Sequence, residues 1–427
     1  MEKLVQQFRD IQHTLRKNEV WRQVDFTDML NAGLVLPSGE RQTAEYRCNI
    51  PNLDTYRSFT ENGLCHQDST TTPEGIRLAG LRNASSQQPD FVGKYFGTCT
   101  PLANPYLQFN TDNYTDGIFA YVPNNVVANK PIQIQSVINA GHGLFLQVRN
   151  LIVVGRDSHA IIIHCDDSFD THPAFSNNVT EIVVEEGAQV EYYKMQNLNN
   201  NTGLLNHTYV TLGQGASFRS VAITLNGGHI RNHTEVRMLG EHCQVQAHGL
   251  YLNDQEQRVD NYIFVDHAFP NCKSHELYKG ILDDSAQGTF NGHVLVREGA
   301  VKTEAYQTNK NILLTDKAFI NTKPFLEIYN DDVKCSHGST IGQLDEQALF
   351  YIRSRGISER TARTLLSYAF CDEVLQQITL PSLRDNLIDL VKKRLHGELT
   401  PCSECSLQCS TPCNGPEVNF HIDPSKL

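Results

Sequence analysis

One short pattern recurs through the middle of the chain: Asp157-Ser-His-Ala160, Glu186-Gly-Ala188, Gln214-Gly-Ala216 and Glu241-His-Cys243. Each copy places a small residue after a polar or glycine corner and directly ahead of a strand-like run. The small residues follow one another at steps of 28, 28 and 27 residues. Weaker copies lie at Ala286, Ala300 and Ala318. The central part of the chain is therefore built from a repeated unit.

A period near 28 residues in strand-rich sequence predicts the stacked coils of a mainly β protein, a parallel β-helix or β-solenoid. Each coil can bury its apolar face only against its neighbours, and a small residue fits the tight corner. An antiparallel sandwich is disfavoured because Asn-Gly and Asp-Gly hairpin signals are sparse. A doubly wound fold is disfavoured because helix-sized amphipathic stretches between the strands are missing.

Helical patterns flank the repeats. Leu4, Phe8, Ile11 and Leu15 share one face of an N-terminal helix, and Leu383, Leu387, Leu390, Val391 and Leu395 share a face of a C-terminal one. We expect four regions: an N-terminal mixed region over 1–110, the β-helix core over 111–335, a helical module over 336–397 and a cysteine-rich tail over 398–427. The helical module could cap the end of the solenoid, carry a docking site, or do both.

Net charge, cysteine content and missing motifs argue against several classes of function. The 427 residues carry a formal net charge of −12, which disfavours binding to nucleic acids or anionic membranes. Neither a secretory signal nor a membrane span is predicted, so the twelve cysteines are interpreted as reduced thiols of a cytoplasmic protein. Phosphate-binding loops, the nucleophile elbow and the H-E-x-x-H motif are missing, which disfavours the common ATPases, hydrolases and metalloproteases.

Charged and potential metal-binding side chains lie closest together in the segment Asp331-Asp-Val-Lys-Cys335-Ser-His337-Gly. On an extended strand, Cys335 and His337 point to the same face, where a thiolate and an imidazole could share a metal ion. Two ligands do not close a site, so further ligands would come from elsewhere or from another chain. The alternative is a buried thiol beside a hydrogen-bonded histidine with no ligand role.

Four more cysteines crowd the tail: Cys402, Cys405, Cys409 and Cys413. Four thiols this close together could hold zinc or a cluster. Their spacing matches no standard zinc ribbon or ferredoxin pattern, and a disordered reduced tail is the alternative.

An ordered series of motifs resembles the SufB/SufD family of iron–sulfur cluster assembly scaffolds, and SufD more than SufB. The motifs include Thr115-Asp-Gly-Ile-Phe119, Ser274-His-Glu-Leu-Tyr-Lys-Gly280, Asn321-Thr-Lys-Pro324, the segment around His337 and Phe350-Tyr-Ile-Arg-Ser-Arg-Gly356. The resemblance covers roughly residues 105–396 and is loose before them.

The resemblance implies a right-handed parallel β-helix between helical terminal regions. It implies a scaffold subunit, not an enzyme, that pairs with a SufB-like subunit and binds a SufC-like ABC ATPase through its C-terminal helices. His337 matches the SufD histidine at the SufB interface, with Cys335 beside it, where a transient iron–sulfur cluster would form. A homodimer is a further option when the chain is alone.

Two alternative functions stay open. One is a purely structural β-helix partner without cluster chemistry. The other is a β-helix carbohydrate enzyme, for which Asp166-Asp167 or Asp283-Asp284 would be the paired carboxylates. Neighbouring residues on a strand point to opposite faces, so neither pair is a convincing acid–base pair.

Overall fold

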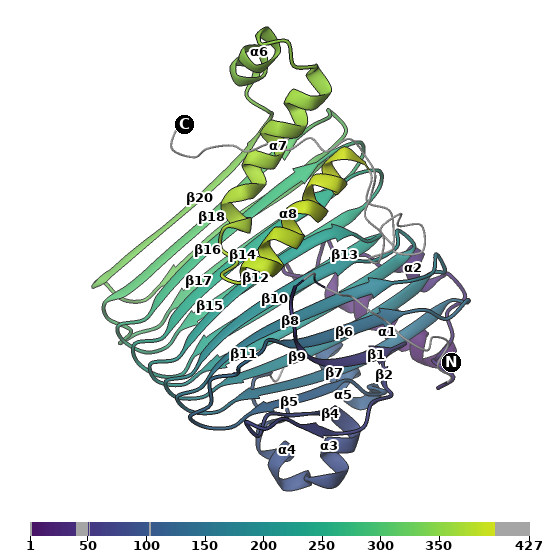
Figure 1. The fold of residues 1–427 in the computed structure, drawn as a ribbon, viewed down its shortest axis with the longest axis vertical. Coiled ribbons are helices and arrows are strands. Elements are labelled where there is room, and N and C mark those ends of the chain that lie inside the picture. Colours follow the sequence, from purple (N-terminus) through teal and green to yellow (C-terminus); the bar gives the residue numbers. More distant parts are fainter. Residues whose placement is uncertain (1, 40–49, 51, 102–103, 398–427) are drawn as a thin grey trace.

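The computed structural model describes residues 2–39, 50, 52–101 and 104–397. Within them, strands form two ten-stranded sheets that face each other along the whole stack (Figure 1). One sheet has the order β2-β1-β6-β8-β10-β12-β14-β16-β18-β20, and the other has the order β19-β17-β15-β13-β11-β9-β7-β5-β4-β3. The chain alternates between the sheets from β5 onward, so each pair of successive strands makes one coil. The predicted β-solenoid is confirmed.

The strands have the following bounds: β1 Tyr56–Glu61, β2 Leu64–Cys65, β3 Thr70–Thr71, β4 Arg77–Gly80, β5 Ile118–Val122, β6 Ile132–Ile138, β7 Leu144–Val154, β8 His159–Ser168, β9 Ala174–Val184, β10 Gln189–Asn197, β11 Thr202–Leu212, β12 Ser217–Asn226, β13 His229–Met238, β14 Gln244–Asn253, β15 Arg258–His267, β16 Lys273–Leu282, β17 Gln287–Val296, β18 Thr303–Leu313, β19 Phe319–Ile328 and β20 Val333–Gly342. The pairs β1/β2, β3/β4 and β4/β5 are antiparallel, and the pairs along the main stack are parallel.

The helices have the following bounds: α1 Glu2–Leu15, α2 Thr27–Leu30, α3 Leu81–Gln87, α4 Pro89–Tyr95, α5 Pro105–Asn113, α6 Glu346–Ser354, α7 Glu359–Leu375 and α8 Pro381–His396. Ser358 caps α7 by accepting from the Thr361 amide, and Gly397 ends α8 with a positive φ of 74°. The division into four regions stays a prediction, although β1–β4 lie ahead of residue 110 and β20 continues to Gly342.

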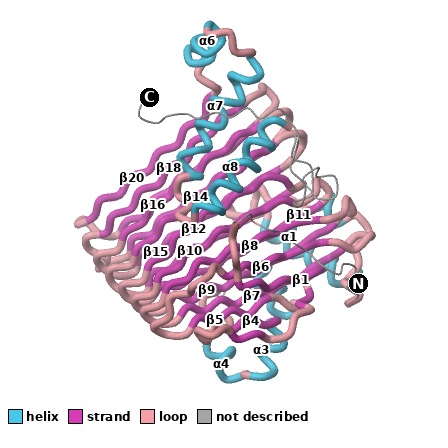
Figure 2. Tube along the Cα trace, viewed as in Figure 1, coloured by secondary structure: helices cyan, strands magenta, loops and turns pink. Residues whose placement is uncertain are grey.

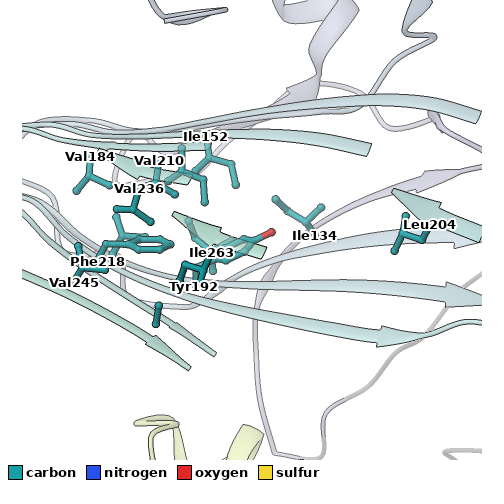
Figure 3. Close-up of a cluster of buried hydrophobic side chains, with 14 of the residues drawn as sticks. Ile134, Ile152, Val184, Tyr192, Leu204, Val210, Phe218, Val236, Val245 and Ile263 are labelled. Atoms are coloured by element: carbon teal, nitrogen blue, oxygen red, sulfur yellow. The ribbon is translucent and has the colours of Figure 1, made fainter. Parts of the chain in front are cut away.

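Apolar side chains from both sheets meet in the interior of the solenoid. Ile152, Val184 and Val236 come from one sheet, and Phe218 and Val245 face them from the other (Figure 3). Strand residues that point inward alternate with residues that point outward. This alternation gives every coil an inner face and an outer face.

One corner of the solenoid repeats with a fixed backbone conformation. A residue with positive φ comes directly before a buried small residue in six coils: Asp157–Ser158, Gly187–Ala188, Gly215–Ala216, His242–Cys243, Asn271–Cys272 and Lys302–Thr303. Glycine, Asn, Asp and His tolerate this conformation best. The positive φ thus explains the residue types found at this corner of the sequence pattern.

The register corrects parts of the proposed repeat. Ala160 aligns with Val190, so Ser158 is the residue that matches Ala188. Ala286 and Ala318 precede Gln287 and Phe319, which pair in the other sheet, so both alanines belong to the opposite corner. Small residues occur at both corners, and a single period cannot tell the two corners apart.

Helices cover the outer faces of the two sheets. Phe8 of α1 packs on Phe145, Phe175 and Leu205 of the sheet that ends in β19. The helices α7 and α8 lie across the other sheet, where Leu375, Leu387 and Val391 meet Tyr193, Val221 and Leu277 (Figure 1). The interpretation of the C-terminal helices as an end cap is therefore wrong for α7 and α8, which cover the flank of the solenoid. Helix α6 lies beyond the last coil (Figure 2), and most residues of β20 stay exposed.

Candidate functional site

Cys335 and His337 lie on β20, the last strand of its sheet. In the parallel ladder, Cys335 is the partner of Ala305 and His337 is the partner of Gln307. Ala305 and Gln307 are buried inside the solenoid, and aligned residues of neighbouring strands point the same way. Cys335 and His337 therefore share the inner face of the terminal coil, at its open mouth.

The two side chains have different surroundings. Cys335 is partly buried and packs against an apolar group that contains Val294, Val296 and Ala305. Burial raises the pKa of the Cys335 thiol, which favours its neutral form at pH 7 in the free chain. His337 is exposed. The site thus offers a sheltered thiol beside an accessible imidazole.

Two buried polar residues lie below His337: Gln307 is one coil below it, and Glu276 is two coils below it. Gln307 aligns with Glu276 on β16, and Gln307 Nε2 donates a 2.7 Å hydrogen bond to Glu276 Oε2. Both residues are almost completely buried, and burial raises the pKa of Glu276 to about 8. The sequence analysis missed this pair because no motif marks it. Steps of 30 and 31 residues back from His337 lead to it once the coil length is known.

Apolar side chains are exposed around the open end. They are Phe319 at 59%, Phe325 at 46%, Ile328 at 39%, Tyr329 at 61% and Ile341 at 48% exposure. The free edges of β19 and β20 also offer backbone donors and acceptors to another strand. Exposed apolar groups beside unpaired strand edges are typical of a surface that binds another protein.

No closed metal site is found among the described residues, since no three His, Cys, Asp or Glu side chains gather there in a suitable arrangement. Cys335 and His337 would need further ligands from outside this group. The tail cysteines Cys402, Cys405, Cys409 and Cys413 lie outside the described residues, and metal binding by them stays a prediction.

The carboxylates considered for a carbohydrate enzyme have other surroundings. Asp166 is buried inside the solenoid, with Lys194 Nζ at 2.7 Å from its Oδ2. Asp283 and Asp284 lie in a corner turn, where Asp284 accepts from the Gln255 amide. Neither pair forms an acid and a base across a groove.

Comparison with known proteins gives matches over most of the chain. The family model for the SufBD core domain of SUF system FeS cluster assembly matches residues 136–370, and the model for the SufBD protein N-terminal region matches residues 2–134. A SufBD family iron–sulfur cluster assembly protein of Synechocystis is 30% identical, with 89% of this chain and 87% of the relative covered. The SufD protein of Escherichia coli is 30% identical, with 90% and 89% covered. The chloroplastic protein ABCI7 of Arabidopsis thaliana is 33% identical, with 88% and 82% covered.

The chain belongs to the SufBD family of iron–sulfur cluster assembly proteins. Within this family it is SufD-like, because relatives named SufD match it over most of its length. The described residues contain no helix that is long and apolar enough to cross a membrane.

Proposed function

We propose that this chain is a SufD-type scaffold subunit without a catalytic centre of its own. It pairs with a SufB-like subunit through the open end of the solenoid and binds a SufC-like ABC ATPase through its C-terminal helices. Cys335 and His337 then face the partner and supply part of the ligand set for a transient iron–sulfur cluster. The cluster is cargo, and the partner provides the remaining ligands.

The observation that carries this proposal is the open last coil. A thiol and an imidazole share its inner face, and exposed apolar side chains surround it. Thiolate and imidazole are suitable ligands for iron in clusters. A partner that covers this end would bury the apolar rim and close the incomplete ligand set in one step.

The proposed ATPase surface lies on α6, beyond the last coil (Figure 1). Phe350 is 75% exposed and Tyr351 is 60% exposed, next to each other on this helix. Large neighbouring aromatic side chains are frequent anchors of protein interfaces. Deleting α7 or α8 would be a less clear test of ATPase binding, because it would also uncover the apolar flank of the solenoid that these helices cover.

Replacing Phe350 and Tyr351 together with Ala should therefore reduce co-purification of the ATPase at least tenfold. The thermal unfolding of the chain should stay unchanged, because both side chains are exposed. Leu239→Ala, which truncates an exposed side chain at a distant corner, is the matched control. ATPase binding that survives the double substitution would contradict α6 as the docking surface.

A purely structural partner is the second candidate function. It is favoured by the exposure of His337 and by the absence of a third ligand among the described residues. It differs from the main proposal in one respect: the open end would bind the partner, but His337 would play no part in cluster formation.

A further inference from the structure

We propose that Gln307, held in place by Glu276, positions the imidazole of His337 from inside the solenoid. This inference rests on the proposed function, in which His337 is a cluster ligand. It assigns a positioning role to two residues that make no contact with the cargo themselves.

The ladder brings the three residues into one column. His337 on β20 aligns with Gln307 on β18, which aligns with Glu276 on β16. Neighbouring strands lie about 4.8 Å apart, so aligned side chains stack directly on one another. Gln307 is 1% exposed and Glu276 is fully buried, whereas His337 lies above them at the open mouth.

The amide of Gln307 has a defined orientation. Its Nε2 donates to Glu276 Oε2 at 2.7 Å, which leaves Oε1 as the free end of the amide. Within the described part of the chain, Gln307 Oε1 is buried and has no hydrogen-bond donor. A buried acceptor without a donor is costly, and the neighbour on the open side is a histidine with N–H groups.

The opposite sheet makes room for this amide. A Cβ on Gly292 of β17 would come within 2.2 Å of Gln307 Nε2, so only glycine leaves space for the side chain in its present place. The amide is therefore confined by Gly292 on one side and by Glu276 below. This confinement limits how far the amide can turn.

Such an arrangement matches the way proteins control histidine ligands. A histidine that binds a metal through one ring nitrogen usually donates its other N–H to a fixed acceptor, which sets the tautomer and the ring orientation. In the proposed arrangement, Gln307 Oε1 accepts from the ring N–H of His337 that faces it. Burial raises the pKa of Glu276 to about 8, so the support below the histidine is predominantly neutral at pH 7.

The test replaces Gln307 with Met, which has a similar length and no polar group. Nitrogen NMR of histidine-labelled chain reports the tautomer of His337, and its signal is identified by its loss in His337→Ala. We expect one dominant tautomer in the unmodified chain and a mixture typical of exposed histidine in Gln307→Met. Ser339→Ala, on the same face of β20 but aligned with Asn309, is the matched control and should leave the signal unchanged.

If Gln307→Met does not fold, the double variant Gln307→Met with Glu276→Met replaces the whole buried pair with apolar groups, which proteins tolerate better than a half-removed pair. An unchanged tautomer in whichever of these variants folds would overturn the inference.

Cluster formation in the complex with the SufB-like partner separates this inference from the proposed function. Loss of a supporting acceptor typically costs about 10- to 100-fold in metal binding, so Gln307→Met should reduce cluster formation by that factor. A changed tautomer, together with normal cluster formation in both Gln307→Met and His337→Ala, would support the positioning contact but contradict the ligand role of His337.

Discussion

Glu276 shows how a single buried side chain makes the stability of this fold depend on pH. It has no cationic partner among the described residues, and burial raises the pKa of its carboxyl group from 4.5 to about 8. The folded chain therefore holds this proton more tightly than the unfolded chain does. Stability contributed by the protonated form is complete below pH 4.5 and is lost as the pH rises to about 8.

Glu276→Gln removes this pH-dependent cost and keeps an acceptor for Gln307. Its free energy of unfolding should match that of the unmodified chain near pH 4.5 and exceed it by roughly 5 kcal/mol at most above pH 8. Denaturant unfolding across this pH range measures the difference. The exposed Glu298→Gln is the control and should show no such trend. A difference that does not grow with pH would contradict the buried, protonated carboxyl group.

At the scale of elements, the sequence predicted strands and helices better than it predicted their alignment. Two β-branched runs of the sequence, Leu151-Ile-Val-Val154 and Glu181-Ile-Val-Val184, lie in β7 and β9, because β-branched residues favour strands in any coil. The alignment of Ala188 with Ser158 depends on the length of one turn, which has no separate signal. The flank position of α7 and α8 depends on tertiary packing, which helical periodicity alone does not reveal.

The packing of α8 on the sheet gives a prediction at this scale. Leu387 is 1% exposed and lies between α8 and the strands. Leu387→Ala should lower the free energy of unfolding by about 2–5 kcal/mol, because it leaves a cavity in a close-packed layer. Phe350→Ala on the exposed helix α6 removes a larger side chain but should change stability by about 0.5 kcal/mol or less. Equal effects in the two variants would contradict the packing of α8 against the solenoid.

At the scale of the whole molecule, the two ends of the stack differ. Strands β1–β5 begin the stack with antiparallel pairs, whereas β19 and β20 end it with free parallel edges. The sequence placed Cys335 and His337 on one strand face, but it could not place them at a free edge. Their position follows from the number of coils and from the helices that leave this end uncovered (Figure 2).

A free end with exposed apolar groups should also bind a second copy of the chain when the partner is absent. Ile341 is 48% exposed and points from β20 toward the same side as its buried ladder partner Asn311. Ile341→Lys should shift the isolated chain from dimer toward monomer in sedimentation equilibrium, because it places a charge in the contact. Val127→Lys, at an exposed site far from this end, is the control. Self-association that Ile341→Lys does not weaken would show that the two copies bind each other through another surface.

The central claim is that His337 contributes to cluster formation at the interface between this chain and its SufB-like partner. The most direct measurement compares the anaerobically purified complex with its His337→Ala variant, by subunit stoichiometry and by the absorbance of the assembled cluster. We predict that the complex forms with normal stoichiometry, because one exposed side chain is a small part of the interface, and that cluster formation falls at least tenfold. An intact complex that assembles clusters at the unmodified rate would contradict the account.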